Sequence, residues 1–234
     1  MKKLLYLLLF INFLNATERI ITLSPAINEI AFALGLGDKI IANTEFCDFP
    51  IESKNIQKVG GYGSVSLEKV VNLNPTIILN QDYDKKLNQS LKDLNFKTLV
   101  YKTNSLEDIK FTIKDLGEVF NKKEEAKDLN NQIENSLESL KNIIENQKIL
   151  IVISPQSTPS NQIFVVGNFI YFEDIIKASN NINAYQSSLK SQPSINSEKL
   201  ITLNPDIIIL LAPYLKDDKE KDDMLNLWKK LPVT

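Results

Sequence analysis

Short runs of apolar residues alternate along this chain with segments in which apolar positions recur every three or four residues. A short continuous run is typical of a strand buried on both faces, and the longer spacing is typical of an amphipathic helix. Strands are predicted at 19–24, 38–43, 76–79, 96–101, 149–154 and 206–210, and helices at 27–37, 83–95, 105–147 and 217–230. The alternation predicts an α/β fold with mostly parallel sheets.

One helix–strand pattern occurs twice. VSLEKVVNLNPTIILN at 65–80 returns 130 residues later as INSEKLITLNPDIIIL at 195–210, with seven of sixteen residues identical. Ser66 or Asn196 suits the N-cap of a short helix, and a proline then ends that helix. RIITLSP at 19–25 matches ILIVISP at 149–155 at the same offset. We therefore predict two similar lobes with a ligand cleft between them.

The two copies set the expected domain boundaries. We expect an N-terminal lobe over 17–104, a C-terminal lobe over 148–234 and, between them, a helical segment over 105–147 that includes a long α-helix bridging the lobes. An ordinary amphipathic surface helix of the first lobe is the alternative for this segment. The strand at 96–101 has no counterpart after 217–230, so we expect the sequence to be incomplete at its C-terminus.

The first residues have the pattern of a secretory signal peptide. Lys2 and Lys3 form a basic start, an apolar run follows over 4–14, and Ala16 offers a small residue for cleavage. We expect 1–16 to be removed on export to the periplasm; a short buried N-terminal helix is the alternative. No second apolar stretch is long enough to span a bilayer.

Composition and charge exclude several function classes. The chain has 27 basic and 29 acidic residues, so a mildly acidic exported protein with scattered charge is a poor candidate for binding nucleic acid. The absence of histidine removes the common nucleophile–histidine arrangements and argues against a zinc or manganese site. Cys47 is the only cysteine and leaves no internal disulfide to form.

The motifs together resemble one family. The signal peptide, RIITLSPAINEIAFALGLGDKIIA at 19–42, DFP at 48–50 and the two helix–strand copies are similar to periplasmic substrate-binding proteins of ABC importers. The resemblance covers roughly 19–230 and is strongest to the cobalamin-binding members of the cobalamin, iron-siderophore and haem type. It implies a cobalt corrinoid or iron chelate as ligand, no resident cofactor or metal, no enzymatic activity, a monomer, and inner-membrane permease subunits as partners.

The resemblance also implies roles for individual residues. Glu68 and Glu198 match the carboxylates that dock on permease arginines, although a carboxylate near a helix N-terminus also offsets the helix dipole without any partner. The ligand-binding aromatics of the family match Phe46, Tyr62 and Phe164, for which core packing is the alternative. Relatives that bind cobalamin place a large aromatic where this chain has Gln192, which puts the identity of the ligand in doubt.

Other residues and functions remain open at this point. Ser24 and Ser154 stand at strand ends, where binding residues gather in open α/β sheets, but both are equally suited to ending a strand. Ferric-siderophore or haem binding is the alternative within the family. A sensor or adhesin domain on the same fold would differ in having no permease for Glu68 and Glu198 to contact, and an enzyme would need catalytic groups converging on the cleft.

Overall fold

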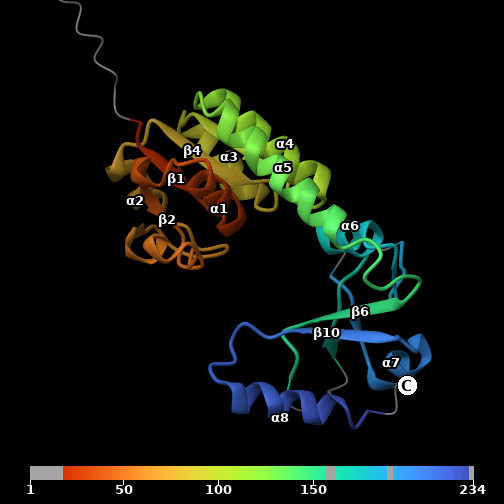
Figure 1. Cartoon of the computed structure of the whole chain (residues 1–234). Coiled ribbons are helices and arrows are strands. Elements are labelled where there is room, and N and C mark those ends of the chain that lie inside the picture. Colours follow the sequence, from red (N-terminus) through yellow and green to blue (C-terminus); the bar gives the residue numbers. More distant parts are fainter. Residues whose placement is uncertain (1–17, 157–161, 189–191, 232–234) are drawn as a thin grey trace, which may run out of the picture. The chain divides into compact units, whose positions relative to one another are not determined.

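The computed structural model describes residues 18–156, 162–188 and 192–231, which form two compact units (Figure 1). Unit 1 holds the described residues up to Glu29 together with Leu36–Val100, and unit 2 holds Ile30–Gly35 together with the described residues from Tyr101 onward. The predicted signal peptide lies outside the described residues. The predicted lobe boundaries and the bridging role of 105–147 stay predictions.

Unit 1 is built on a five-stranded sheet. Its strands are β1 (Ile20–Thr22), β2 (Ile40–Asn43), β3 (Gln57–Lys58), β4 (Ile77–Gln81) and β5 (Thr98–Tyr101), in the order β3-β2-β1-β4-β5. The pairs β1–β2, β1–β4 and β2–β3 are parallel. Helices α2 (Leu67–Leu73) and α3 (Lys85–Asp93) belong to unit 1, as does the first part of α1 (Pro25–Ala33), with 3-10 turns at Gly37–Lys39 and Ile51–Asn55. Val70 of α2 and Leu91 of α3 pack on Ile21, Leu23 and Ile78.

Unit 2 begins with the helices α4 (Leu106–Val119) and α5 (Lys123–Ser139). Its strands β6 (Lys148–Ile153), β8 (Ile182–Asn183) and β10 (Ile207–Leu211) form a parallel sheet in the order β10-β6-β8. Strands β7 (Ile163–Phe164) and β9 (Ser194–Ile195) pair antiparallel. Helices α6 (Tyr171–Ala178), α7 (Ser197–Leu203) and α8 (Asp218–Trp228) complete the unit. Both faces of β6 are buried, one in a cluster with α7 and α8 and the other in a cluster with α6.

The repeated helix–strand element is present in both units as predicted. Helices α2 and α7 are capped alike, because Ser66 and Asn196 accept from the backbone N–H three residues ahead. Both helices end in a left-handed asparagine before the proline, with φ and ψ of 44° and 62° at Asn74 and 44° and 64° at Asn204. The α/β fold with mostly parallel sheets is confirmed.

Strands β1 and β6 come before the repeated element in their units, and they correspond at a different sequence offset from the one that the sequence suggests. Ile77 of β4 pairs with Ile20, whereas Ile207 of β10 pairs with Ile149, so β1 and β6 match at 129 residues instead of 130. Ser24 and Ser154 are therefore not equivalent positions. A short apolar run buried on both faces carries no alternation to specify its register, which is why the sequence match was one residue out.

The helical segment predicted over 105–147 contains two helices, α4 and α5, that pack against each other. The break falls at Asn121, which adopts φ 56°, a conformation that asparagine tolerates better than most residues. Gly117 of α4 permits the close contact, because a Cβ there would lie 2.4 Å from the Cβ of Ala126 on α5. The apolar spacing over 105–147 correctly predicts helix. It does not predict the break, because neither Gly nor Pro, the usual helix breakers, stands there.

Candidate ligand-binding site

Exposed aromatic side chains gather on the loops that follow the strands of unit 1. Tyr62, after β3, is 71% exposed, and its ring stacks on that of Tyr83, after β4, with centroids 5.0 Å apart and planes inclined by 25°. Phe46, after β2, is also exposed, and its Cε2 lies 3.1 Å from the point where a Cβ on Gly61 would stand. The structure thus brings Phe46 and Tyr62, both predicted, to one place. We call Phe46, Tyr62 and Tyr83 the aromatic platform.

Glycines let the loop before α2 turn tightly enough to present Tyr62. Gly60 has φ 125°, and a Cβ there would stand 2.3 Å from the carbonyl oxygen of Ser64, so no other residue fits without displacing the backbone. The Ser64 N–H donates to Gly61 O at 3.1 Å and the Ser66 N–H donates to Val59 O at 2.8 Å. These bonds close the turn under the Tyr62 backbone.

A buried polar network holds the loop that carries Phe46. Asn28 of α1 is fully buried and accepts from Thr22 Oγ1 at 2.8 Å. Its Nδ2 donates to Ser53 Oγ at 2.8 Å and to the carbonyl oxygen of Phe49 at 3.2 Å. Asn43 Nδ2 donates to the same Ser53 hydroxyl at 2.9 Å. The network therefore ties the loop between β2 and β3 to the sheet and to α1, as a buried polar group requires.

Lys58 and Cys47 belong to the support of this loop. Lys58 Nζ donates to Asn43 Oδ1 at 2.7 Å and to the carbonyl oxygens of Cys47 and Ser53. Cys47 is 1% exposed, its Sγ lies 3.2 Å from Thr44 Oγ1, and burial raises the pKa of its thiol. A neutral thiol packed under the loop is a structural group, not a nucleophile.

Ser24 comes soon after β1 and is fully buried. Its hydroxyl donates to Gln81 Oε1 at 2.7 Å, and its carbonyl accepts from Asn28 N at the start of α1. Ser24 thus joins the ends of β1 and β4 and has no exposed surface. The ligand contact that the sequence predicts for Ser24 stays a prediction.

The predicted residues of unit 2 lie on and beside β7. Phe164 is 38% exposed. Gln192 is exposed as well, and its Nε2 donates to Val165 O at 2.8 Å, directly after Phe164. Ser154 is exposed after β6 with φ 49°, and its N–H donates to Leu211 O. Gln192 therefore supports the strand that carries Phe164, and Ser154 closes the strand end; both remain predicted ligand contacts.

Glu68 and Glu198 lie at matching places on α2 and α7. Each is the second residue of its helix and each is exposed. Neither takes part in an ion pair among the residues that the structure describes. An unpaired exposed carboxylate in each unit is what docking on a basic partner would require, and the helix dipole explains the same placement without a partner.

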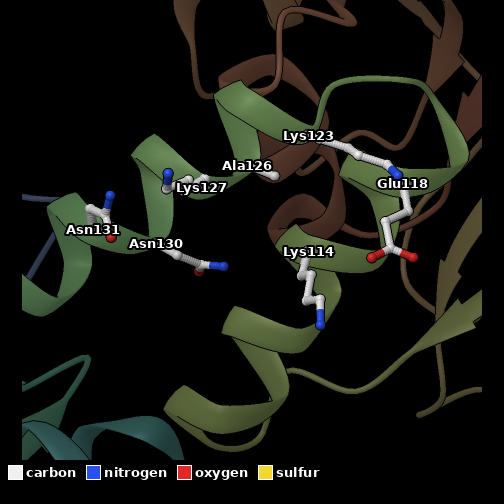
Figure 2. A pocket seen from close by; sticks show the side chains of 7 residues that line it. All are labelled: Lys114, Glu118, Lys123, Ala126, Lys127, Asn130 and Asn131. Atoms are coloured by element: carbon white, nitrogen blue, oxygen red, sulfur yellow. The ribbon is translucent and has the colours of Figure 1, made fainter.

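A separate hollow of about 290 Å³ lies between α4 and α5 (Figure 2). Lys114 and Glu118 of α4 line it, together with Lys123, Ala126, Lys127, Asn130 and Asn131 of α5. None of the predicted ligand-binding residues contributes to it. The hollow and the aromatic platform are therefore different features of the molecule.

The profile that describes periplasmic binding proteins matches residues 20–228. The chain belongs to the periplasmic binding protein family. The sequence motifs predicted a periplasmic substrate-binding protein, and this prediction is confirmed. The family is one of substrate-binding proteins, not of enzymes.

Individual relatives agree with this placement. A protein of Vibrio parahaemolyticus named vitamin B12-binding protein is 28% identical over 231 residues, which cover 92% of this chain and 79% of the relative. The crystal structure of the vitamin B12-binding protein BtuF of Vibrio cholerae has a TM-score of 0.75 at 21% identity, over 91% of this chain and 82% of that one. The haem-binding protein HutB of the same species also has a TM-score of 0.75, at 20% identity, over 94% and 86%. At these identities the two structures establish the fold alone.

Two further observations concern the described residues only. None of their helices combines the length and the apolar character needed to cross a membrane. Nowhere in the same residues do three His, Cys, Asp or Glu side chains gather as a metal ion would require.

Sequence reasoning missed Tyr83 and the Asn28 network. Tyr83 stands between two aspartates at a strand-to-helix junction, where a polar turn was the natural interpretation. Asn28 lies in a segment that is predicted to be a helix from the spacing of its apolar residues, and that spacing assigns no role to a polar residue. Its one signal was a polar side chain near the buried face of a short apolar helix, and three of its four partners lie 6, 21 and 25 residues away.

Proposed function

We propose that the protein captures a cobalamin-like corrinoid in the periplasm and delivers it to the permease of an ABC importer. The observation that carries this proposal is the aromatic platform of unit 1, exposed on loops that follow β2, β3 and β4. Relatives named vitamin B12-binding protein support the same ligand class. Phe164 and Gln192 of unit 2 are the further contacts that we assign to this ligand.

Flat rings suit a flat macrocycle. Each aromatic face offers a large apolar contact area and has few torsions to immobilise on binding. Phe46 and Tyr62 are 59% and 71% exposed, so most of their surface is available to a ligand before any rearrangement. The Asn28 network and the Gly60 turn hold the backbones that carry these rings, and a preformed site loses less affinity to ordering.

The charge around the platform favours a neutral ligand over a carboxylate-bearing one. The loops at 44–56, 59–66 and 82–84 contain one lysine, Lys54, and five carboxylates, those of Glu45, Asp48, Glu52, Asp82 and Asp84. The ammonium of Lys58 points beneath the loop to three oxygen acceptors. Haem carries two propionates and a corrin carries amides, so this surface repels haem more than it repels cobalamin.

Delivery needs a surface for the permease. We assign it to Glu68 and Glu198, one exposed carboxylate in each unit at equivalent positions of α2 and α7. Arginines of a membrane subunit would pair with them by charge-assisted hydrogen bonds. The signal peptide pattern of residues 1–16 supports an exported, periplasmic protein.

Calorimetric titration of the purified chain with cobalamin, haemin and a ferric siderophore tests the ligand. We expect one-to-one binding that is tightest for cobalamin, and roughly 10- to 100-fold weaker cobalamin binding for Tyr62→Ala because one aromatic contact is lost. Phe111→Ala, which removes a 61% exposed ring from α4, is the matched control. Tight binding of haemin or the siderophore alone would replace cobalamin as the ligand, and no binding by the folded chain would overturn the proposal.

The permease contact has its own test. Glu68→Lys combined with Glu198→Lys should abolish co-purification with the permease and leave cobalamin affinity unchanged. Asp222→Lys combined with Asp223→Lys, on the exposed part of α8, is the control for added charge. A loss of cobalamin affinity in the first pair would instead place those carboxylates at the ligand.

A further inference from the structure

Tyr62 has little support from its own loop. Its backbone lies in a turn closed by hydrogen bonds between Gly61 and Ser64 and between Val59 and Ser66, none of which involves the side chain. Its neighbours Gly61 and Gly63 have no side chains to pack against the ring. A 71% exposed tyrosine on such a turn would sample several rotamers if nothing else held it.

Tyr83 is the ring that lies against Tyr62, and Tyr83 is itself held at both ends. Its hydroxyl donates to the carbonyl oxygen of Leu23, at the end of β1, at 3.1 Å. Burial raises the pKa of the Tyr83 phenol, so the hydroxyl keeps the proton that it donates. Its backbone is fixed by Asp84, whose side chain accepts from Leu87 N at 2.9 Å and caps α3.

We propose that Tyr83 is a positioning residue for the ligand: it holds the Tyr62 ring in the orientation in which Tyr62 stacks on a flat macrocycle. This inference rests on the proposed function. Tyr83 transmits the rigidity of β1 and α3 to a side chain on a glycine-rich turn. The contribution is preorganisation, because a ring already held in place loses no rotamer freedom when the ligand binds.

The size of the effect follows from that cost. Immobilising one side chain costs about 0.5–1.5 kcal/mol, which corresponds to roughly 2- to 12-fold in affinity. Tyr83→Ala should therefore weaken cobalamin binding roughly 2- to 12-fold. Tyr83→Phe keeps the stacked ring and loses only the bond to Leu23, so its effect should be smaller.

A double-mutant cycle separates positioning from a general structural role. If Tyr83 acts through Tyr62, then Tyr83→Ala has no further effect on cobalamin affinity in a Tyr62→Ala background. Equal losses in both backgrounds, or no loss in either, would overturn the proposal. Phe111→Ala should change nothing in either background.

Amide hydrogen exchange of the full chain without ligand gives an independent result. Exchange in 59–66 should become faster in Tyr83→Ala and stay near the wild-type rate in Tyr83→Phe and Phe111→Ala. Unchanged exchange in Tyr83→Ala would overturn the proposed support of Tyr62 even where cobalamin binds. Failure of the wild type to bind any of the three ligands would overturn the proposed function, and the exchange result would still decide whether Tyr83 holds the Tyr62 loop.

Discussion

Helix α2 with strand β4 in unit 1 and helix α7 with strand β10 in unit 2 are two copies of one element. Their N-caps accept from the same backbone position, and the φ and ψ angles of their left-handed asparagines agree to within 2°. Their burial does not agree: the first three residues of β4 are at most 4% exposed, whereas Ile209 in the middle of β10 is 40% exposed. Strand β4 lies between β1 and β5, and β10 has β6 on one side and no other strand among the described residues.

The difference shows which properties belong to a segment and which belong to its neighbours. Caps and breaks arise within a few residues, so the same letters produce the same local geometry twice. Burial depends on what packs alongside, so nearly the same apolar strand is central in unit 1 and, within the part of the chain that the structure describes, at an edge in unit 2. The comparison predicts that equivalent substitutions have equal effects at the caps and unequal effects in the strands.

The strands should give the largest contrast. Leu79→Ala in β4 removes a fully buried side chain and should lower the free energy of unfolding by about 2–5 kcal/mol. Ile209→Ala, its counterpart in β10, should cost less than about 1 kcal/mol because much of that side chain is already in water. Urea denaturation followed by circular dichroism measures both, and similar losses would mean that β10 is covered in solution.

The buried asparagines should give a smaller contrast. Asn28→Ala in unit 1 leaves several buried partners unpaired, each costing about 1–3 kcal/mol, so we expect a total loss of about 3 kcal/mol. Asn183→Ala in unit 2 loses the bonds to Val166 O and Tyr185 N and should cost about 1–2 kcal/mol. Thermal unfolding measures the two shifts. A smaller loss at Asn28 than at Asn183 would mean that the network does not hold the Phe46 loop.

The helix caps should show no contrast. Ser66→Ala and Asn196→Ala should each cost about 1 kcal/mol, since each removes one acceptor from the first turn. Glycine at the same positions should cost only a few tenths of a kcal/mol. Melting temperatures of the four variants test this equality, and a difference above about 1 kcal/mol between the two alanine variants would show that the caps interact with their surroundings.

Much of the fold could be read from the pattern of residues. Helix α3 at Lys85–Asp93 and helix α8 at Asp218–Trp228 lie within the segments predicted for them. The sequence repeat also correctly identifies α7 as the counterpart of α2 and β10 as the counterpart of β4. Strands β1 and β6 correspond one residue away from the offset that the sequence suggests, and the helical segment predicted over 105–147 contains a break between two helices. Both differences depend on packing: β1 and β6 are buried on both faces, and Gly117 of α4 leaves room for Ala126 of α5.

The candidate site was only partly predictable. Phe46 and Tyr62 were found because each stands in a motif of the family, and their proximity then follows from the carboxyl ends of β2 and β3. Tyr83 belongs to no motif and becomes significant only when its ring is seen against Tyr62. For Ser24 the sequence left ligand contact and strand ending open, and the structure shows it fully buried, with its hydroxyl bonded to Gln81 at the end of β4.

The sequence by itself determined the two-fold repeat, the α/β class, the caps and breaks of α2 and α7, and the family, because these depend on residues close together along the chain. The tertiary structure decided the offset at which β1 and β6 correspond, the break between α4 and α5, and the difference in burial between β4 and β10. It also decided the stacking of Tyr83 on Tyr62 and the Asn28 network. Except for the break, where Gly117 meets Ala126 on the next helix, these features depend on contacts between residues far apart in sequence, and such contacts exist only once the strands have packed.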